Sequence, residues 1–334
     1  MILVTGGCGY IGSHQIVKLI ENDFDVISID NYSNSSPDII EKINQITNSS
    51  NKFIDGDIRD IELLDKIFFE NKISSVIHFA GLKSISESIE DPLKYYSSNV
   101  NGSLALFRAM KKAAINKIIF SSSATVYGDK HHLPWHEKLE LDMPLSPYAQ
   151  SKLIIEEILK SISSSSNKWR VGILRYFNPI GSHKSGIIGE NTYQEAGNLI
   201  PSIIKVILKE SPYLNVFGAD YNTSDGTGVR DYLHIDDLLD GHLKALNFLE
   251  SNEGFHIWNL GRGKGYSVLE VISAFEELLG DKVPYKIQDR RRGDLSKYWA
   301  EVLKAKEELN WKAKIDIKGM VKDTLRYVNK IKDL

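Results

Sequence analysis

Short, continuous apolar runs recur along this chain, with helix-length segments between them. The runs are rich in Val, Ile and Phe and do not alternate with polar residues, which is typical of parallel strands buried on both faces. The segments between them, such as 11–23 and 61–71, carry apolar residues at helical spacing. This alternation predicts an α/β fold with a doubly wound parallel sheet. We expect its strands at Ile2–Thr5, Val26–Asp30, Lys52–Asp57, Val76–Ala80, Ile118–Ser123, Val171–Tyr176 and His256–Leu260.

The alternation stops after about Asn178. Residues 181–229 are rich in Gly, Asn and Ser around one expected helix, 198–209, and a glycine-containing loop at 261–265 leads into another, 268–279. A chain of 334 residues is also too long for one ordinary core. We therefore predict a larger Rossmann-like domain formed by 1–180 with 230–262. A smaller α+β domain is expected from 181–229 with 263–334.

The first predicted strand runs directly into a glycine-rich loop. Gly6, Gly9 and Gly12 permit a tight turn, close approach of the backbone to a pyrophosphate, and close packing of the next helix on the strand. The N-terminus of that helix offers free N–H groups and its dipole to phosphates. The second strand ends at Asp30, whose carboxylate would bind the adenosine ribose and repel a 2′-phosphate. The loop therefore predicts a dinucleotide site that prefers NAD to NADP.

Tyr148 is followed four residues later by Lys152, in a segment where Ser146 can cap a helix and Pro147 can take its first position. The Tyr and Lys side chains then lie on one helix face, a turn apart. An ammonium group beside a phenol lowers the phenol pKa, so Tyr148 would be a usable base near neutral pH. Ser123 ends a predicted strand, and the carboxyl ends of such strands line the ligand crevice. We predict Ser123, Tyr148 and Lys152 as the catalytic residues.

Composition narrows the function classes. A net charge of −3 gives no basic footprint for nucleic acid. The single cysteine, Cys8, excludes a disulfide framework and a multi-cysteine zinc site, and we interpret it as a small residue that fills the loop. No apolar run approaches membrane-spanning length, and no signal-peptide pattern precedes the first strand. We therefore expect a cytosolic protein without nucleic-acid or membrane partners.

The loop Thr-Gly-x-x-Gly-x-x-Gly, the strand end Ser-Ser-Ser-Ala-Thr-Val-Tyr-Gly and the Tyr-x3-Lys pair together resemble the extended short-chain dehydrogenase/reductase superfamily. Longer strings are similar to those of the UDP-glucose (UDP-galactose) 4-epimerases within it. These strings are His78–Lys83, Arg175–Pro179, Asp225–Tyr232 and Gly293-Asp294. The resemblance extends from residue 2 to about residue 330.

The resemblance implies reversible epimerisation at C4 of UDP-glucose and UDP-galactose, an isomerase reaction of galactose metabolism. It implies transient hydride transfer to tightly bound NAD, a 4-keto sugar that turns about its phosphate link, and a homodimer. Tyr148 would remove the 4-OH proton, Lys152 would lower the tyrosine pKa and hold the nicotinamide ribose, and Ser123 would hydrogen-bond the sugar oxygen.

The resemblance also assigns ligand contacts by position. For NAD they are Gly6, Gly9, Tyr10, Ile11, Gly12, Asp30, Asn31, Asn34, Ser35, Asp57, Ile58, Phe79, Ala80, Gly81, Lys83, Ser98, Ser123, Tyr148, Lys152 and Phe177. For the UDP-sugar they are Lys83, Ser123, Tyr148, Asn178, Asn198, Leu199, Arg230, Tyr232, Arg291, Asp294 and Tyr298. Arg230 and Arg291 would act as bidentate clamps on the diphosphate.

The chain departs from the family pattern at three places. Ser98 stands where many bacterial relatives have an Asn beside the cofactor. Residues 191–197 replace a loop that contains Pro and Gly, and Arg292 replaces a usual Glu, which makes the diphosphate pocket more positive. At a fourth position, Tyr298, the resemblance implies a contact with the sugar C2 substituent, where epimerases of N-acetylated sugars tend to have a small residue. We therefore expect poor use of N-acetylated UDP-sugars.

The nearest alternatives are nucleotide-sugar dehydratases and decarboxylases of the same superfamily. Related dehydratases place acidic residues after the strand-end hydroxyl, where this chain has Ala124-Thr125, so that acid is missing. A non-catalytic dinucleotide-sensing module would not need Tyr148 and Lys152 in register. A metal hydrolase built on His131, His132 and His136 lacks a helical His pair, so we expect surface histidines and no metal site.

Overall fold

The computed structural model describes residues 1–129, 131–190, 198–291 and 293–332. The chain divides into two compact units. Unit 1 contains Met1–Gly128, Glu140–Arg175 and Leu239–Trp258, and unit 2 contains Asp129–Leu139, Tyr176–Leu238 and Asn259–Leu334. The domain boundaries that we predicted near 180, 230 and 262 stay a prediction.

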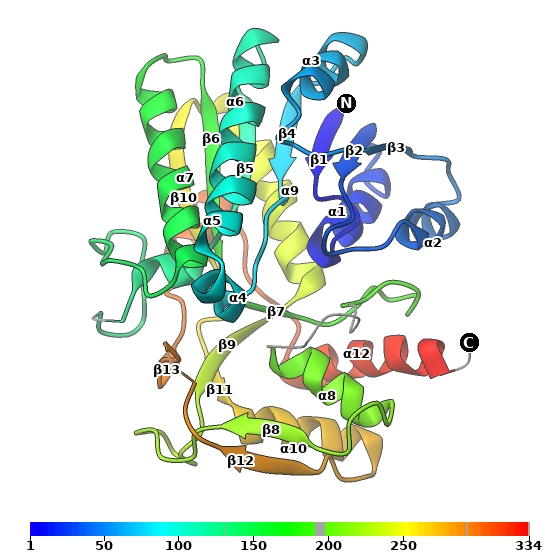
Figure 1. Cartoon of the computed structure of the whole chain (residues 1–334), viewed down its shortest axis with the longest axis vertical. Helices are drawn as coiled ribbons and strands as arrows, with labels where there is room; N and C mark the ends of the chain where they lie inside the picture. The colour runs from blue at the N-terminus through cyan, green and yellow to red at the C-terminus, as the bar shows by residue number, and fades with distance from the viewer. Residues whose placement is uncertain (130, 191–197, 292, 333–334) are drawn as a thin grey trace. The chain divides into compact units, whose positions relative to one another are not determined.

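The sheet of unit 1 has seven strands in the order β10-β6-β5-β4-β1-β2-β3. The pairs of β1 with β2 and β4, of β2 with β3, and of β4 with β5 are parallel (Figure 1). The predicted α/β class with a doubly wound parallel sheet is thereby confirmed. The strands are β1 Ile2–Thr5, β2 Val26–Asp30, β3 Lys52–Asp55, β4 Ser75–His78, β5 Lys117–Ser123, β6 Arg170–Tyr176 and β10 Gly254–Leu260.

Helices cover both faces of this sheet because both faces are apolar. Leu64 of α3, Leu106 of α6 and Leu159 of α7 share one buried cluster with strand residues such as Val171 and Ile173. Gly172, which lies between these two β6 residues, faces Leu249 of α9 instead. The helical segments are α1 Tyr10–Ile20, α2 Asp38–Thr47, α3 Ile61–Glu70, α4 Ile85–Glu90, α5 Pro92–Tyr95, the π-helix η1 Tyr96–Asn101, α6 Gly102–Lys112, the 3-10 helix η2 Ala124–Tyr127, α7 Pro147–Ser164 and α9 Ile235–Ser251.

Two predicted strands end two residues earlier than expected. β4 ends at His78 because the backbone N–H groups of Phe79 and Ala80 both turn to the Thr5 carbonyl, at 3.1 Å each. β3 ends at Asp55, after which the Gly56 N–H donates to the Asp30 carbonyl at 3.0 Å. The chain therefore leaves the sheet at the carboxyl ends of β4 and β3, where cofactor contacts were predicted.

Unit 2 is built around β9, which pairs with β7, β11 and β13. A second sheet pairs β8 with β12 in parallel, and Ile203 of α8, Phe275 of α10 and Val321 of α12 share a buried core. None of these strands was predicted individually. The elements are β7 Asn178–Ile180, α8 Leu199–Ile207, β8 Leu214–Phe217, β9 Val229–His234, β11 Gly265–Ser267, α10 Val268–Leu279, β12 Tyr285–Gln288, β13 Lys297–Tyr298, α11 Leu303–Leu309 and α12 Ile317–Lys332.

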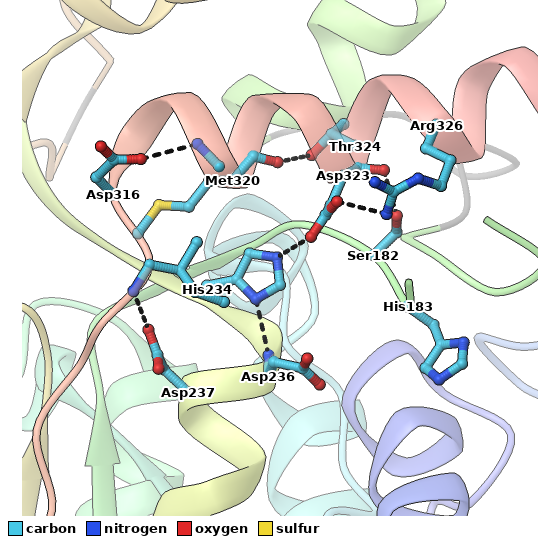
Figure 2. Close-up of polar contacts among 12 residues, drawn as sticks. Ser182, His183, His234, Asp236, Asp237, Asp316, Met320, Asp323, Thr324 and Arg326 are labelled. Carbon is cyan, nitrogen blue, oxygen red and sulfur yellow. Dashed lines mark hydrogen bonds and ion pairs between the residues drawn. The ribbon is translucent and has the colours of Figure 1, made fainter. Parts of the chain in front are cut away.

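Buried polar contacts attach α12 to β9 (Figure 2). The His234 Nδ1 accepts a hydrogen bond from the Asp236 backbone N–H at 3.0 Å, so the ring proton is on Nε2, which lies 3.3 Å from Asp323 Oδ2. Arg326 pairs with the other oxygen of Asp323, and the Ser182 hydroxyl donates to its backbone carbonyl. The end of β9 is thereby connected to a helix about ninety residues later in the sequence.

The Asp231 carboxylate connects three segments of unit 2. Its side chain is fully buried and accepts backbone N–H bonds from Arg262 at 2.7 Å, Gly263 at 3.0 Å and Ala300 at 3.1 Å. Oδ2 accepts two of the three bonds. Two chain segments that follow β10 and β13 therefore depend on one acidic side chain of β9.

We predict that Asp231→Asn destabilises the protein. The amide nitrogen would face backbone N–H donors, and buried donors left unsatisfied cost about 1–3 kcal/mol. Urea unfolding followed by tryptophan fluorescence measures the loss. Asp289→Asn, at an exposed position of the same unit, is the matched control and should leave the midpoint unchanged. An unaltered midpoint in Asp231→Asn would show that the backbone donors have other acceptors.

Candidate active site

The loop between β1 and α1 has no room for side chains on its inner side. Gly6 has φ +72°, and a Cβ at Gly6 would lie 2.7 Å from the Ala80 backbone nitrogen. A Cβ at Gly12 would lie 2.1 Å from the Gly6 carbonyl oxygen. At Gly9, by contrast, a Cβ would meet only that oxygen, at 3.3 Å, so this part of the loop is open. Gly9 is the N-cap residue of α1 and has no side chain that could bond the first N–H groups of the helix. An anion can take the place of such a side chain.

Asp30 holds the same loop from the end of β2. Its carboxylate accepts hydrogen bonds from the Cys8 backbone N–H at 2.8 Å, the Tyr32 backbone N–H at 2.9 Å and the Ser35 hydroxyl at 2.9 Å. Cys8 is buried, and burial together with the Asp30 charge raises the pKa of its thiol, in keeping with a residue that fills the loop. The open glycine loop, the uncapped helix N-terminus and the fixed carboxylate fit a bound dinucleotide.

The other predicted cofactor residues lie at the start of α1, after the strands β2, β3 and β4, and in η1. The Asn31 amide donates to Asp57 Oδ2 at 2.7 Å, and hydrogen bonds from Arg59 lower the pKa of Asp57 to about 2. Tyr10 and Ile11 begin α1, Asn34 is exposed after β2, and Ile58 is buried after β3. Phe79, Ala80, Gly81 and Lys83 follow β4, and Ser98 lies in η1.

Tyr148 and Lys152 lie in the first two turns of α7, as predicted. Ser146 caps the helix by accepting the Ala149 N–H at 3.2 Å, and Pro147 takes the first position. The Lys152 side chain is 5% exposed, and its Nζ lies 6.0 Å from the centroid of the half-buried Tyr148 ring. The ammonium donates to the Ser121 carbonyl at 2.9 Å, and burial lowers the Lys152 pKa to about 8.

Ser123 ends β5 and caps η2. Its Oγ accepts hydrogen bonds from the Thr125 N–H at 3.2 Å and from the Thr125 hydroxyl at 2.9 Å. A serine hydroxyl has one proton and two lone pairs. Because Thr125 donates to both acceptor positions of Ser123 Oγ, the Ser123 proton can be donated to an oxygen of another group.

In unit 2, the predicted substrate residues Arg230, Asn178 and Tyr298 meet. The Tyr298 hydroxyl donates to Asn178 Oδ1 at 3.2 Å, and the Arg230 guanidinium lies 4.6 Å from the Tyr298 ring centroid. Trp135 also stacks on that ring, with centroids 5.1 Å apart and planes at 1°. The Tyr298 ring therefore contacts both a cation and an indole.

Other predicted ligand residues of unit 2 lie nearby in the same fold. Tyr232 is buried on β9. Burial raises the pKa of its phenol above the ordinary value, and the charges of Arg230 and Arg291 offset only part of that rise. Arg291 pairs with Asp294 at 2.9 Å. Asn198 and Leu199 begin α8, and the buried Phe177 ring lies 6.0 Å from that of Tyr298.

Sequence reasoning missed two residues of these sites. Asn99, buried in η1, accepts the Leu82 N–H at 2.8 Å and donates to the Ser151 hydroxyl at 3.0 Å, so it connects the segment after β4 to α7. Trp135 lies in a segment without a motif. No local pattern marks either residue, because both act through partners far away in the sequence.

Two of the predicted departures from the family pattern involve residues that the structure does not describe. The loop 191–197 and Arg292 lie outside the described residues. Within the described ranges, no three His, Cys, Asp or Glu side chains are grouped to hold a metal ion. No helix among those residues is long and apolar enough to cross a membrane.

The fold and the groups above define a class of protein. A Rossmann-like sheet with a glycine loop, an acidic residue after β2, and a hydroxyl, phenol and ammonium at β5 and α7 are typical of NAD-dependent enzymes that oxidise or reduce a carbon–oxygen bond. The NAD dependent epimerase/dehydratase family matches residues 2–261.

Relatives narrow the class further. The chain is 50% identical to the UDP-glucose 4-epimerase of Pasteurella multocida, over 98% of this chain and 97% of the relative. Two solved structures superimpose with a TM-score of 0.96. One is UDP-glucose 4-epimerase from Bifidobacterium longum in complex with NAD+ and UDP, 46% identical over 98% of both chains. The other, from Stenotrophomonas maltophila, carries NAD and formylated UDP-arabinopyranose and is 42% identical over 99% of this chain and 98% of that one.

The chain therefore belongs to the NAD dependent epimerase/dehydratase family and, within it, to the UDP-glucose 4-epimerases. It is an NAD-using isomerase. The family, the enzyme class and the cofactor predicted from the sequence are confirmed.

Proposed function

We propose that this enzyme interconverts UDP-glucose and UDP-galactose by inverting the sugar at C4, with Tyr148 as the base. The observation that carries the proposal is the arrangement of a half-buried phenol, a buried ammonium and a serine hydroxyl at α7 and the end of β5. The similarity to UDP-glucose 4-epimerases over nearly the whole chain supports the choice of substrate.

Tyr148 removes the proton of the sugar 4-hydroxyl and later returns one. Lys152 supports this role because its positive charge stabilises the phenolate at pH values where tyrosine is ordinarily protonated. Ser123 donates its proton to the same sugar oxygen, which stabilises the charge that develops there. The glycine loop and Asp30 would hold NAD, which would supply an acceptor for the hydride of C4 and allow its return to the opposite face of the sugar.

Unit 2 supplies the groups that recognise the nucleotide. Arg230 and Arg291 bind the diphosphate, since guanidinium groups match phosphate oxygens bidentately. The position of Arg230 over the ring of Tyr298, another predicted substrate residue, supports this role. Asn178 and Tyr298 contact the sugar.

We predict that the purified protein contains NAD and works without added cofactor. Because each turnover would return NAD to its oxidised form, the reaction would not require the cofactor to exchange with NAD in solution. Denaturing the protein and measuring the released dinucleotide tests this, together with conversion of UDP-galactose to UDP-glucose. Absence of dinucleotide, with activity that depends on added NADPH, would contradict the proposed function.

We predict that Tyr148→Phe loses about 10²–10⁴-fold in kcat, which is the usual contribution of a positioned acid–base group. Binding of UDP-sugar, measured by calorimetry, should persist because the ring still packs. Lys152→Met should in addition retain less NAD. Tyr285→Phe, at an exposed tyrosine of β12, is the control. Near-normal turnover in Tyr148→Phe would mean that another group is the base.

Tyr298 is proposed to set sugar selectivity. Its ring contacts Trp135 and Arg230, and its hydroxyl donates to Asn178. These three contacts oppose a movement of the ring away from a larger C2 substituent. Extra atoms forced into a packed site cost about 1–3 kcal/mol, so an acetamido group should be disfavoured roughly tenfold to hundredfold.

We therefore predict that Tyr298→Cys raises kcat/KM for UDP-N-acetylgalactosamine relative to UDP-galactose. Steady-state kinetics with both sugars, on wild type and variant, measure the ratio. Tyr285→Cys makes the same chemical change at an exposed site and should leave the ratio unaltered. Equal efficiency of the wild type with both sugars would remove the proposed selectivity and leave the epimerase assignment intact.

The finer parts of the assignment are also proposals: a homodimer that acts in the cytoplasm, in galactose metabolism, without nucleic-acid or membrane partners. The net charge of −3 supports the lack of a nucleic-acid partner. Exposed apolar side chains at Ile85 and Ile89, one turn apart on α4, and at Leu93 on α5 support a subunit contact on unit 1, because such groups are often covered in oligomers.

A further inference from the structure

A buried ion pair lies behind the proposed catalytic residues. Glu156 of α7 and Arg175 of β6 each expose 2% of their side chains. The guanidinium donates twice to the carboxylate, Nε to Oε1 at 3.1 Å and Nη2 to Oε2 at 2.6 Å. Taking two full charges out of water is expensive, and packed apolar residues often stabilise a core as well. Stability alone therefore does not account for the pair.

The contacts of the pair lead to the catalytic residues. Ser122, which directly precedes Ser123, donates its hydroxyl to Glu156 Oε1. The Arg175 guanidinium lies 4.8 Å from the ring centroid of Tyr127, the last residue of the helix that Ser123 caps. The pair thus contacts the chain on both sides of Ser123.

The other side of the pair is α7 itself. Glu156 lies one helical turn after Lys152, on the same face. Lys152 in turn donates to the Ser121 carbonyl at 2.9 Å. Two bonds, from Lys152 to Ser121 and from Ser122 to Glu156, therefore fix the register of α7 against the end of β5.

We propose that the Glu156–Arg175 pair is a positioning device for the catalytic centre, which holds Ser123 in register with Tyr148 and Lys152 and supplies the negative charge that faces the Lys152 ammonium. This inference rests on the roles proposed above for Ser123, Tyr148 and Lys152. Glu156 and Arg175 themselves touch neither substrate nor cofactor in this scheme.

The charges around Lys152 support the second part. Burial lowers the Lys152 pKa to about 8, and the Glu156 charge opposes that shift. His78 is neutral, since burial first and the Lys152 charge second lower its pKa to about 3. The titratable groups that contact Lys152 or act on its charge are Tyr148 and Glu156 on α7 and His78 on β4, and Arg175 of β6 and Tyr127 of η2 lie on the other side of Glu156. Charged groups of α4 and α5, which also pack on α7, bond one another, as Glu87 does with Lys94. Among the described residues, Glu156 is the anion that acts on Lys152, so its removal takes that counter-charge away.

The test compares Glu156→Gln with Glu156→Asp. Glutamine keeps an oxygen for Ser122 and Arg175 but has no charge, so Lys152 should lose its proton at lower pH and no longer favour the Tyr148 phenolate. We expect the alkaline limb of the kcat–pH profile to move to lower pH, with kcat at pH 8 reduced on the order of a hundredfold, as for a displaced catalytic group, and KM for UDP-galactose little changed. Glu156→Asp keeps the charge and should restore the position of the limb.

The double variant Glu156→Leu/Arg175→Met separates positioning from folding. Replacing both ions by apolar residues avoids a lone buried charge, so the thermal midpoint should stay near that of the wild type. The proposal expects kcat and the alkaline limb to remain as altered as in Glu156→Gln. Recovery of both with the midpoint would overturn it, because the pair would then be only structural. Glu250→Gln, which removes the partner of Lys117 at the opposite end of β5, is the control and should leave the limb in place.

Tyr148→Phe and Lys152→Met, assayed in parallel, distinguish the positioning role of the pair from the proposed catalytic roles of these two residues. If both lose turnover while the Glu156 variants keep the wild-type profile, the positioning role is wrong and the proposed function stands. If Tyr148→Phe turns over normally, the proposed base itself is wrong.

Discussion

Parallel pairing of β1 with β2 on one side and β4 on the other is the constraint on which the rest of unit 1 depends. In a parallel sheet, the connections must cross over a face, so helices bury both faces and the strands are apolar throughout. The carboxyl ends of all these strands then lie at one edge. At this edge β1 leads into the glycine loop, β2 ends at Asp30 and β5 ends at Ser123. Residues far apart in the sequence are therefore brought to the same edge of the sheet.

Buried charge is the second theme of unit 1. Burial lowers the pKa of Lys152 to about 8, yet the proposed role of this residue needs its positive charge. Glu156 provides compensation one turn away, and Arg175 prevents that carboxylate from being a lone buried anion. Lys152 bonds the Ser121 carbonyl, and Ser122 bonds the Glu156 carboxylate. The same charged groups therefore balance one another and hold α7 against the end of β5.

In unit 2 a single strand, β9, distributes several tasks among successive side chains. Arg230 lies over the Tyr298 ring, Asp231 binds three backbone N–H groups, and His234 reaches Asp323 of α12. Because neighbouring residues of a strand point to opposite faces, Arg230 and Asp231 act on different surroundings. Arg230, which is proposed to bind the diphosphate, and Asp231, which binds the backbone of two later segments, therefore lie on opposite faces of β9.

The sequence by itself determined the α/β class, the seven strands of the sheet, the glycine loop with Asp30, and the helical register of Tyr148 and Lys152. These features are local: each depends on spacing within a few residues, and the family strings added the substrate class. Strand ends at His78 and Asp55 were missed by two residues, because backbone bonds to Thr5 and Asp30 of neighbouring strands decide them. Tertiary structure alone placed Trp135 against Tyr298, Asn99 against Ser151 and Glu156 against Arg175. Each of these contacts joins segments separated by 19 residues or more, so no periodicity in the chain indicates it, and only the folding of the chain brings the partners together.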